Sequence, residues 1–132
     1  MIALVSKWKL RNGCTEELLT ALEELVENTK TESGVLMYIV HLQAPTPIDS
    51  QGKPLSPPPP PIPLEKQEEI VFVESYENVE ALSQHIQSQT FISFLESNFK
   101  YFQEDPHNPG FPQTETEFLD RRFGFIRPES NF

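Results

Sequence analysis

Hydrophobic positions in the first third of the chain follow two different periods. Apolar residues recur at every second position across residues 2–10, which predicts a strand with one face better buried. Spacings of three and four across residues 15–30 then predict an amphipathic helix. The buried face expected for this helix consists of Leu18, Leu22, Leu25 and Thr29. Gly34 follows as a residue that tolerates a positive φ, and the apolar run at 35–42 predicts a second strand.

The same order of elements returns after residue 68. Residues 69–76 predict a strand in which Ile70, Phe72, Glu74 and Tyr76 share one face. Asn78 can cap a helix that carries His85, and a break near residues 88–89 precedes a second, phenylalanine-rich helical segment at 91–102. Proline and glycine mark residues 105–112 as a loop, and residues 114–127 can form a long last strand.

The resulting order β-α-β-β-α-β is typical of the α+β, ferredoxin-like split βαβ fold, a four-stranded antiparallel sheet with both helices on one face. The chain has 132 residues, a length that fits one domain. Both faces of several strands are apolar, although helices cover only one of them. We therefore expect a homodimer in which two sheets close into an α+β barrel, and the long last strand can pair across the interface.

Residues 44–67 differ from the rest of the chain because they hold nine of the thirteen prolines. Proline lacks an amide hydrogen and fixes φ, so this segment is expected to join neither the sheet nor a helix. It should form an extended, polyproline II-like insertion. Docking on a polyproline-binding domain of the SH3, WW or profilin type is one possible use, and a stiff surface insertion that binds nothing is the other.

Charge and cysteine content exclude several classes of function. Twenty acidic residues against ten basic ones give a net charge of −10, which argues against binding to nucleic acid or to an anionic membrane. The single cysteine, Cys14, excludes an internal disulfide. No segment is long and apolar enough for a membrane span, and no secretory signal is evident. We therefore expect a cytoplasmic protein. His41, His85 and His107 are too dispersed to predict a metal site.

Three short motifs resemble the antibiotic biosynthesis monooxygenase (ABM) family of dimeric α+β barrels. The first is WKLRNG at residues 8–13, and the second is ESGVLMY at 32–38, which resembles the family pattern Glu-x-Gly-x-x-x-Tyr. The third is ESYEN at 74–78, followed by His85 and the aromatic cluster FISF at 91–94. The proline-rich insertion lies outside this pattern.

The resemblance implies a cofactor-independent monooxygenase that oxidises a small aromatic, quinol- or anthrone-like substrate with O2. The catalytic candidates are His85 as the base, Tyr76 as a donor to an oxyanion and Glu74 as an orienting carboxylate. The expected substrate pocket consists of Trp8, Tyr38, Phe72 and Phe91. No cofactor is expected. Haem degradation is disfavoured because the third-strand tryptophan and first-strand asparagine of such enzymes are replaced by Tyr76 and by Ser6 or Lys7.

Structural roles for the same residues remain open. His85 can be a contact between helix and sheet, Glu74 can pair with Arg121 or Arg122, and the phenylalanines of the second helical segment match a buried stripe. The alternative function is a non-catalytic dimeric module that binds a small apolar ligand or uses the proline-rich segment for interaction.

Overall fold

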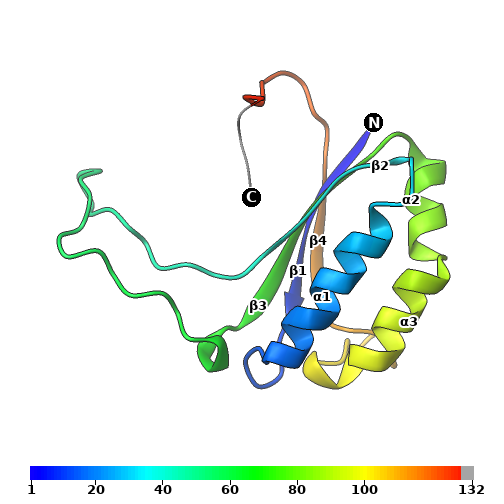
Figure 1. Cartoon of the computed structure of the whole chain (residues 1–132), viewed down its shortest axis with the longest axis horizontal. Coiled ribbons are helices and arrows are strands. Elements are labelled where there is room, and N and C mark those ends of the chain that lie inside the picture. The colour runs from blue at the N-terminus through cyan, green and yellow to red at the C-terminus, as the bar shows by residue number, and fades with distance from the viewer. Residues whose placement is uncertain (129–132) are drawn as a thin grey trace.

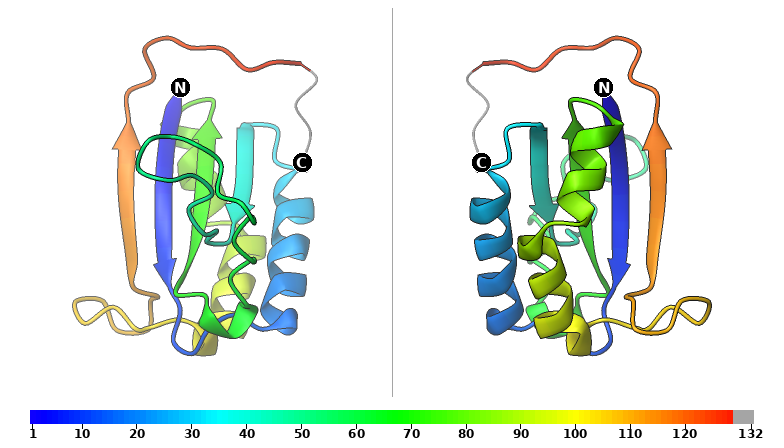
Figure 2. Two further views of the ribbon diagram at one scale, coloured as in Figure 1. Left: turned by 90° about the vertical axis from the view of Figure 1, so that its left-hand side faces the viewer. Right: turned by 90° about the vertical axis from the view of Figure 1, so that its right-hand side faces the viewer.

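Four strands and three helices form two layers in the computed structural model, which describes residues 1–128 (Figure 1). The elements are β1 (Ile2–Lys9), α1 (Glu16–Thr29), β2 (Val35–His41), β3 (Glu69–Tyr76), α2 (Val79–Ile86), α3 (Gln89–Asn98) and β4 (Thr114–Leu119). The sheet has the order β2-β3-β1-β4, and every neighbouring pair is antiparallel. All three helices lie on one face of the sheet (Figure 2). The predicted α+β, ferredoxin-like architecture is therefore confirmed.

Side chains that point from the sheet toward the helices form the main core. Phe72 and Ile70 of β3 are fully buried, and Trp8 of β1 packs on Phe72 with a ring-centroid distance of 5.0 Å. The predicted apolar face of α1 is the buried one and consists of Leu18, Leu22, Leu25 and Thr29. Burial of such side chains is the dominant stabilising term for a small domain.

Polar caps fix where each helix begins. The side-chain oxygen of Thr15 accepts a hydrogen bond from the Leu18 amide, and Asn78 does the same for the amide of Ala81. Ser88 caps α3 in the same way, so the predicted break between the second and third helices occurs at a new cap. These caps satisfy amides that have no partner within the helix.

Two expectations about the strand ends were wrong. The last strand stops at Leu119 rather than continuing to residue 127, because Leu119 pairs with Ala3 and β1 begins only one residue earlier. Gly34 does not have a positive φ. It is required instead by close packing, since a Cβ at this position would lie 2.6 Å from the Cβ of Ala81.

The segment at 44–67, called here the proline arm, projects from the sheet on the side opposite the helices (Figure 1). Its prolines predicted an extended segment that joins neither the sheet nor a helix. Two short regular features occur in it: the 3-10 turn η1 (Leu64–Lys66) near its end, and an isolated bridge between Ile48 and Pro54. A second 3-10 turn, η2 (Phe99–Tyr101), follows α3. Among residues 1–128, no helix has the length and apolarity needed to cross a bilayer.

The face of the sheet that carries no helix is apolar at its centre. Val5 of β1, Val73 of β3 and Ile39 of β2 lie side by side across three strands and are only half-buried. We call these three residues, together with Met37 and Val71, the bare face. Charged residues of β1 and β4 border it on one side.

Candidate functional site

A groove opens where the helix layer ends short of β4. Figure 2 shows β4 beside β1 with no helix in front of it. The groove has a volume of about 310 Å³, at the lower end of the range for small-molecule sites. Apolar side chains from the sheet, from α2 and α3 and from the 105–112 loop form most of its wall. They are Leu4, Trp8, Leu82, Ile86, Phe91, Leu95, Phe111, Pro112 and Phe118.

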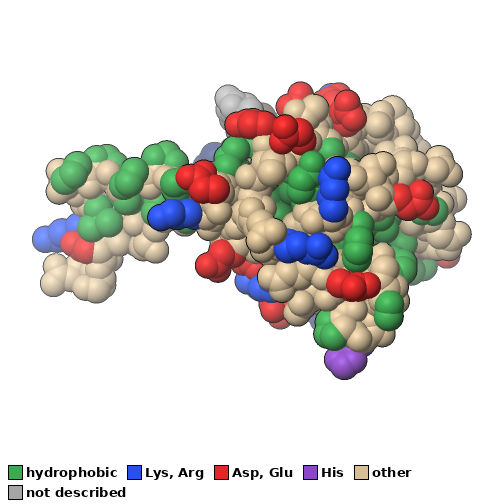
Figure 3. All heavy atoms as spheres, turned by 90° about the horizontal axis from the view of Figure 1, so that it is seen from below, with side chains coloured by type: hydrophobic (Ala, Val, Ile, Leu, Met, Phe, Trp, Pro, Cys, Tyr) green, Lys and Arg blue, Asp and Glu red, His purple; other side chains and the backbone are tan. Residues whose placement is uncertain are grey.

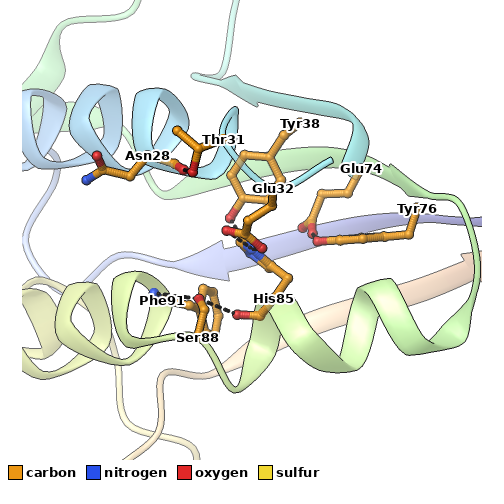
Figure 4. A network of polar contacts seen from close by, with 9 residues as sticks. All are labelled: Asn28, Thr31, Glu32, Tyr38, Glu74, Tyr76, His85, Ser88 and Phe91. Atoms are coloured by element: carbon orange, nitrogen blue, oxygen red, sulfur yellow. Dashed lines mark hydrogen bonds and ion pairs between the residues drawn. The ribbon is translucent and has the colours of Figure 1, made fainter. Parts of the chain in front are cut away.

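Glu74 contributes a carboxyl group to the inner wall of this groove. It lies on the helix-facing side of β3, between Leu4 of β1 and Tyr38 of β2 in the strand register, and is only 7% exposed. The Tyr76 hydroxyl donates a hydrogen bond to Glu74 Oε1 (Figure 4). Burial raises the pKa of Glu74 to about 7, and the Tyr76 hydrogen bond limits the rise. Glu74 can therefore gain or lose a proton near neutral pH.

The hydroxyl pair Ser6 and Thr116 lies on the groove wall formed by β1 and β4. The two oxygens are 2.7 Å apart, and the Trp8 indole N–H donates to the Ser6 oxygen over 3.0 Å. Only one of the two hydroxyl hydrogens can be used in the bond between them. The other remains available to a ligand in the groove.

His85 is not among the residues that line the groove, and it forms polar contacts with Glu32 and Tyr38 (Figure 4). Its side chain is fully buried; Nδ1 is 3.1 Å from Glu32 Oε1, and Nε2 is 3.3 Å from the Tyr38 hydroxyl. Burial lowers the pKa of His85, although the Glu32 carboxylate opposes this change. A neutral ring with its hydrogen on Nδ1 satisfies both contacts, because it donates to Glu32 and accepts from Tyr38.

The residues expected to form the site therefore separate into two groups. Trp8, Glu74 and Phe91 line the groove. The remaining four are not among its lining residues: Phe72, Tyr76 and His85 are fully buried, and Tyr38 is half-buried. Tyr76 belongs to the site through its bond to Glu74, whereas Tyr38 is directed to His85.

The suggested pairing of Glu74 with Arg121 or Arg122 was wrong. Arg122 forms an exposed ion pair with Asp120, and within residues 1–128 Glu74 forms no ion pair. Asp105, the other carboxylate of the groove, accepts a hydrogen bond from the His107 amide of its own loop. No group of three or more His, Cys, Asp or Glu residues in the described part of the chain is placed to hold a metal ion.

Three polar residues of this region were missed by sequence reasoning. Glu32 stands 53 positions from His85, and Thr116 stands 110 positions from Ser6. Ser6 did carry a signal, because it is a polar residue between Leu4 and Trp8 on the inward face of the first strand. Glu32 opens the motif ESGVLMY at 32–38, but the motif indicated no partner for it. Nothing in the local pattern of Thr116 distinguished it from a surface residue.

Comparison with known proteins gives the family. The profile described as antibiotic biosynthesis monooxygenase matches residues 1–97. The chain belongs to this family. No functionally curated protein matches the ABM chain described here.

Solved structures share the fold at low sequence identity. A putative antibiotic biosynthesis monooxygenase from Nitrosomonas europaea has a TM-score of 0.65 at 11% identity, with 93% of this ABM chain and 100% of that chain covered. PA3566 from Pseudomonas aeruginosa has a TM-score of 0.60 at 19% identity, with coverage of 92% and 94%. SnoaB, a cofactor-independent oxygenase from Streptomyces nogalater, has a TM-score of 0.58 at 8% identity, with coverage of 96% and 97%. The similarity to these three establishes the fold.

Proposed function

We propose that this ABM protein is a cofactor-independent monooxygenase that oxidises a small aromatic, anthrone- or quinol-like molecule in the groove. The observation that carries this proposal is the position of Glu74, a carboxyl of near-neutral pKa on the inner wall of a mostly apolar groove. A flat apolar molecule would contact Trp8 and Phe91 while its acidic hydrogen meets this carboxylate. Similarity to a cofactor-independent oxygenase adds support at the level of the fold.

The reaction balances without an external reductant. The Glu74 carboxylate removes a proton from a ring CH2 group that is activated by a neighbouring carbonyl. The resulting carbanion donates an electron to O2, and the two radicals combine as a peroxide anion, which takes the proton back from Glu74 and becomes a hydroperoxide. Glu74 then removes the second hydrogen of the same carbon as a proton, and the O–O bond breaks to leave a carbonyl. One oxygen atom enters the product and the other leaves as water, so the substrate supplies all the electrons. Glu74 gives this second proton to the departing hydroxide, which leaves as water.

The Tyr76 hydroxyl and the Ser6–Thr116 hydroxyl pair assist these steps. Burial and the charge of Glu74 raise the pKa of Tyr76, so its hydroxyl keeps its proton and holds Glu74 Oε1 in place. The unused hydroxyl hydrogen of Ser6 or Thr116 can donate to the oxyanion that forms on the substrate carbonyl. His85 orients Tyr38 in this account and does not touch the substrate.

A homodimer completes the proposal. The bare face holds five apolar side chains without a helix over them, and a second copy of the sheet would remove them from water. Residues 120–128 continue past the end of β1 without pairing in the protomer, and Phe123, Phe125 and Ile126 there are exposed. This segment is available to pair with the partner subunit.

Oxygen uptake tests the activity. Purified protein with a chelator and no flavin should consume O2 in the presence of anthrone or a 1,4-naphthoquinol faster than a protein-free control does. An oxygen electrode measures the rate. Equal rates with and without protein across such a panel would contradict the proposal. If these compounds also raised the melting temperature, a non-catalytic ligand-binding module would then be the better account.

A further inference from the structure

The proline arm is firmly attached at its base. Gln67 is buried, and its side chain accepts from the Gln43 amide over 2.8 Å and donates to the Gln43 carbonyl over 3.0 Å, which ties the two ends of the arm together. The Leu64 carbonyl also accepts from the Cys14 amide over 2.8 Å, at the turn between β1 and α1. Gly13 makes this approach possible, since a Cβ there would lie 2.5 Å from the Glu65 carbonyl oxygen.

The tip of the arm is a closed hairpin. The Leu55 amide donates to the Pro47 carbonyl, and the Asp49 carboxylate accepts from the amides of Gln51 and Lys53. Gly52 has a φ of +80°, which suits the tight turn. A segment ordered by its own hydrogen bonds loses little further entropy when it binds, so the arm is preorganised for a contact.

Within residues 1–128, this hairpin is left open to water. Every residue from 46 to 58 is exposed, and the apolar side chains Ile48 and Leu55 are 46% and 38% exposed. Figure 3 shows apolar side chains gathered along the arm where it stands away from the body of the protein. Such a projection, rich in apolar groups, is typical of a contact with another molecule.

The direction and the length of the proline arm indicate that the molecule it contacts is a second copy of the chain. The arm extends on the side of the sheet that carries the bare face (Figure 1). The seven residues from 57 to 63, six of them proline, span about 20 Å at the rise of a polyproline II helix. Face-to-face sheets pack about 10 Å apart. The arm is therefore long enough to pass the partner's sheet and lie against the outside of that subunit.

Charge favours the same partner. The arm contains two acidic residues, Asp49 and Glu65, and two basic ones, Lys53 and Lys66, so its net charge is zero. The whole chain carries a net charge of −10. A neutral arm can approach a second acidic subunit without the repulsion that a segment of average composition would meet.

We propose that the proline arm is a clasp, in which the Ile48 and Leu55 side chains of each protomer pack on the other subunit of the homodimer. This inference rests on the dimer proposed above and adds an interface that the paired sheets do not provide. In a two-fold dimer the contact occurs twice, so four apolar side chains are buried per dimer.

The double variant Ile48→Ser/Leu55→Ser tests the clasp. Both side chains are exposed, and the hydrogen bonds of the tip use backbone groups and Asp49, so the fold should be kept. Sedimentation velocity over a concentration series should show the dimer Kd raised roughly 10- to 100-fold. Val79→Ser/Ile92→Ser is the matched control, because these side chains are 57% and 36% exposed on the helix layer. The control should leave the Kd unchanged.

The same Kd measurements also distinguish failure of the clasp proposal from failure of the dimer proposal. If the wild-type protein dimerises and the arm variant has the same Kd, the clasp is overturned while the sheet-to-sheet dimer stands. Binding of an added SH3 or WW domain to the arm would not change that conclusion. If the wild-type protein is a monomer at all concentrations, both proposals fail. An equal loss of dimer in the control variant would also overturn the clasp, since the effect would not belong to the arm.

Discussion

Substitution of Glu74 by glutamine should abolish oxygen uptake and, at the same time, make the folded protein more stable at pH 8. Glutamine has nearly the same shape and its carbonyl oxygen can still accept from the Tyr76 hydroxyl. It cannot accept a proton from the substrate. We therefore expect a loss of activity of roughly 100-fold or more, the usual range for removal of a general base.

The gain in stability follows from the raised pKa of Glu74. This carboxyl has a pKa of about 7 in the folded protein against 4.5 for an ordinary glutamate. The folded state therefore binds the proton more tightly than the unfolded state, and the free energy of unfolding decreases as pH rises from about 4.5 to 7. Above pH 7 the buried charge costs about 3 kcal/mol, which Glu74→Gln removes. The melting temperature at pH 8 should rise by roughly 5 to 10 °C.

Thermal unfolding at pH 5 and pH 8 measures this effect. The difference between Glu74→Gln and wild type should be small at pH 5 and large at pH 8. Glu96→Gln is the control, since Glu96 is exposed on α3, away from the bare face, and should change neither stability nor activity. A Glu74→Gln protein that keeps the wild-type rate of oxygen uptake would contradict the assignment of Glu74 as the base.

The variant His85→Ala should lose much of its stability. The imidazole is fully buried, both ring nitrogens have partners, and its ring lies 5.0 Å from the rings of Tyr38 and of Phe91. Alanine leaves a cavity and removes the acceptor of the buried Tyr38 hydroxyl. A loss of about 3 kcal/mol is expected, which corresponds to a melting temperature lower by roughly 10 °C.

Activity measurements on the same variant separate a structural role from a catalytic one. At a temperature where His85→Ala is fully folded, its oxygen uptake should still rise with pH near 7, because the proton acceptor is Glu74. His107→Ala is the control for stability, since His107 is exposed in the 105–112 loop. An unchanged melting temperature together with complete loss of activity in His85→Ala would contradict this account and favour His85 as the base.

The sequence predicted those parts of the fold that depend on neighbouring residues. The spacing of Leu18, Leu22 and Leu25 defined the buried face of α1, and alternation placed Phe72 and Glu74 on the same side of β3. Periodicity is a local property, so it can be detected in a single chain. The length of β4 could not be predicted in this way, because a strand also requires a hydrogen-bonding neighbour. The antiparallel partner β1 begins at Ile2, so residues beyond the end of β4 have no strand beside them.

The candidate site was harder to predict than the fold. Glu74 and Trp8 were named as site residues through the resemblance to the ABM family, but which residues face the groove depends on where the helix layer ends. His85 was expected to meet a substrate, whereas its contacts with Glu32 and Tyr38 arise from packing of α2 against a distant turn and strand. Contacts between residues so far apart in sequence leave no periodic signal.

The pH dependence of oxygen uptake tests the central claim most directly. Initial rates with a saturating anthrone substrate, measured from pH 5.5 to 8.5 in the presence of a chelator, should rise to a plateau with a midpoint near the Glu74 pKa of about 7. The rate should follow this curve because only the carboxylate form can accept the substrate proton. A rate that exceeds the protein-free control but does not change across this range would show that Glu74 is not the base.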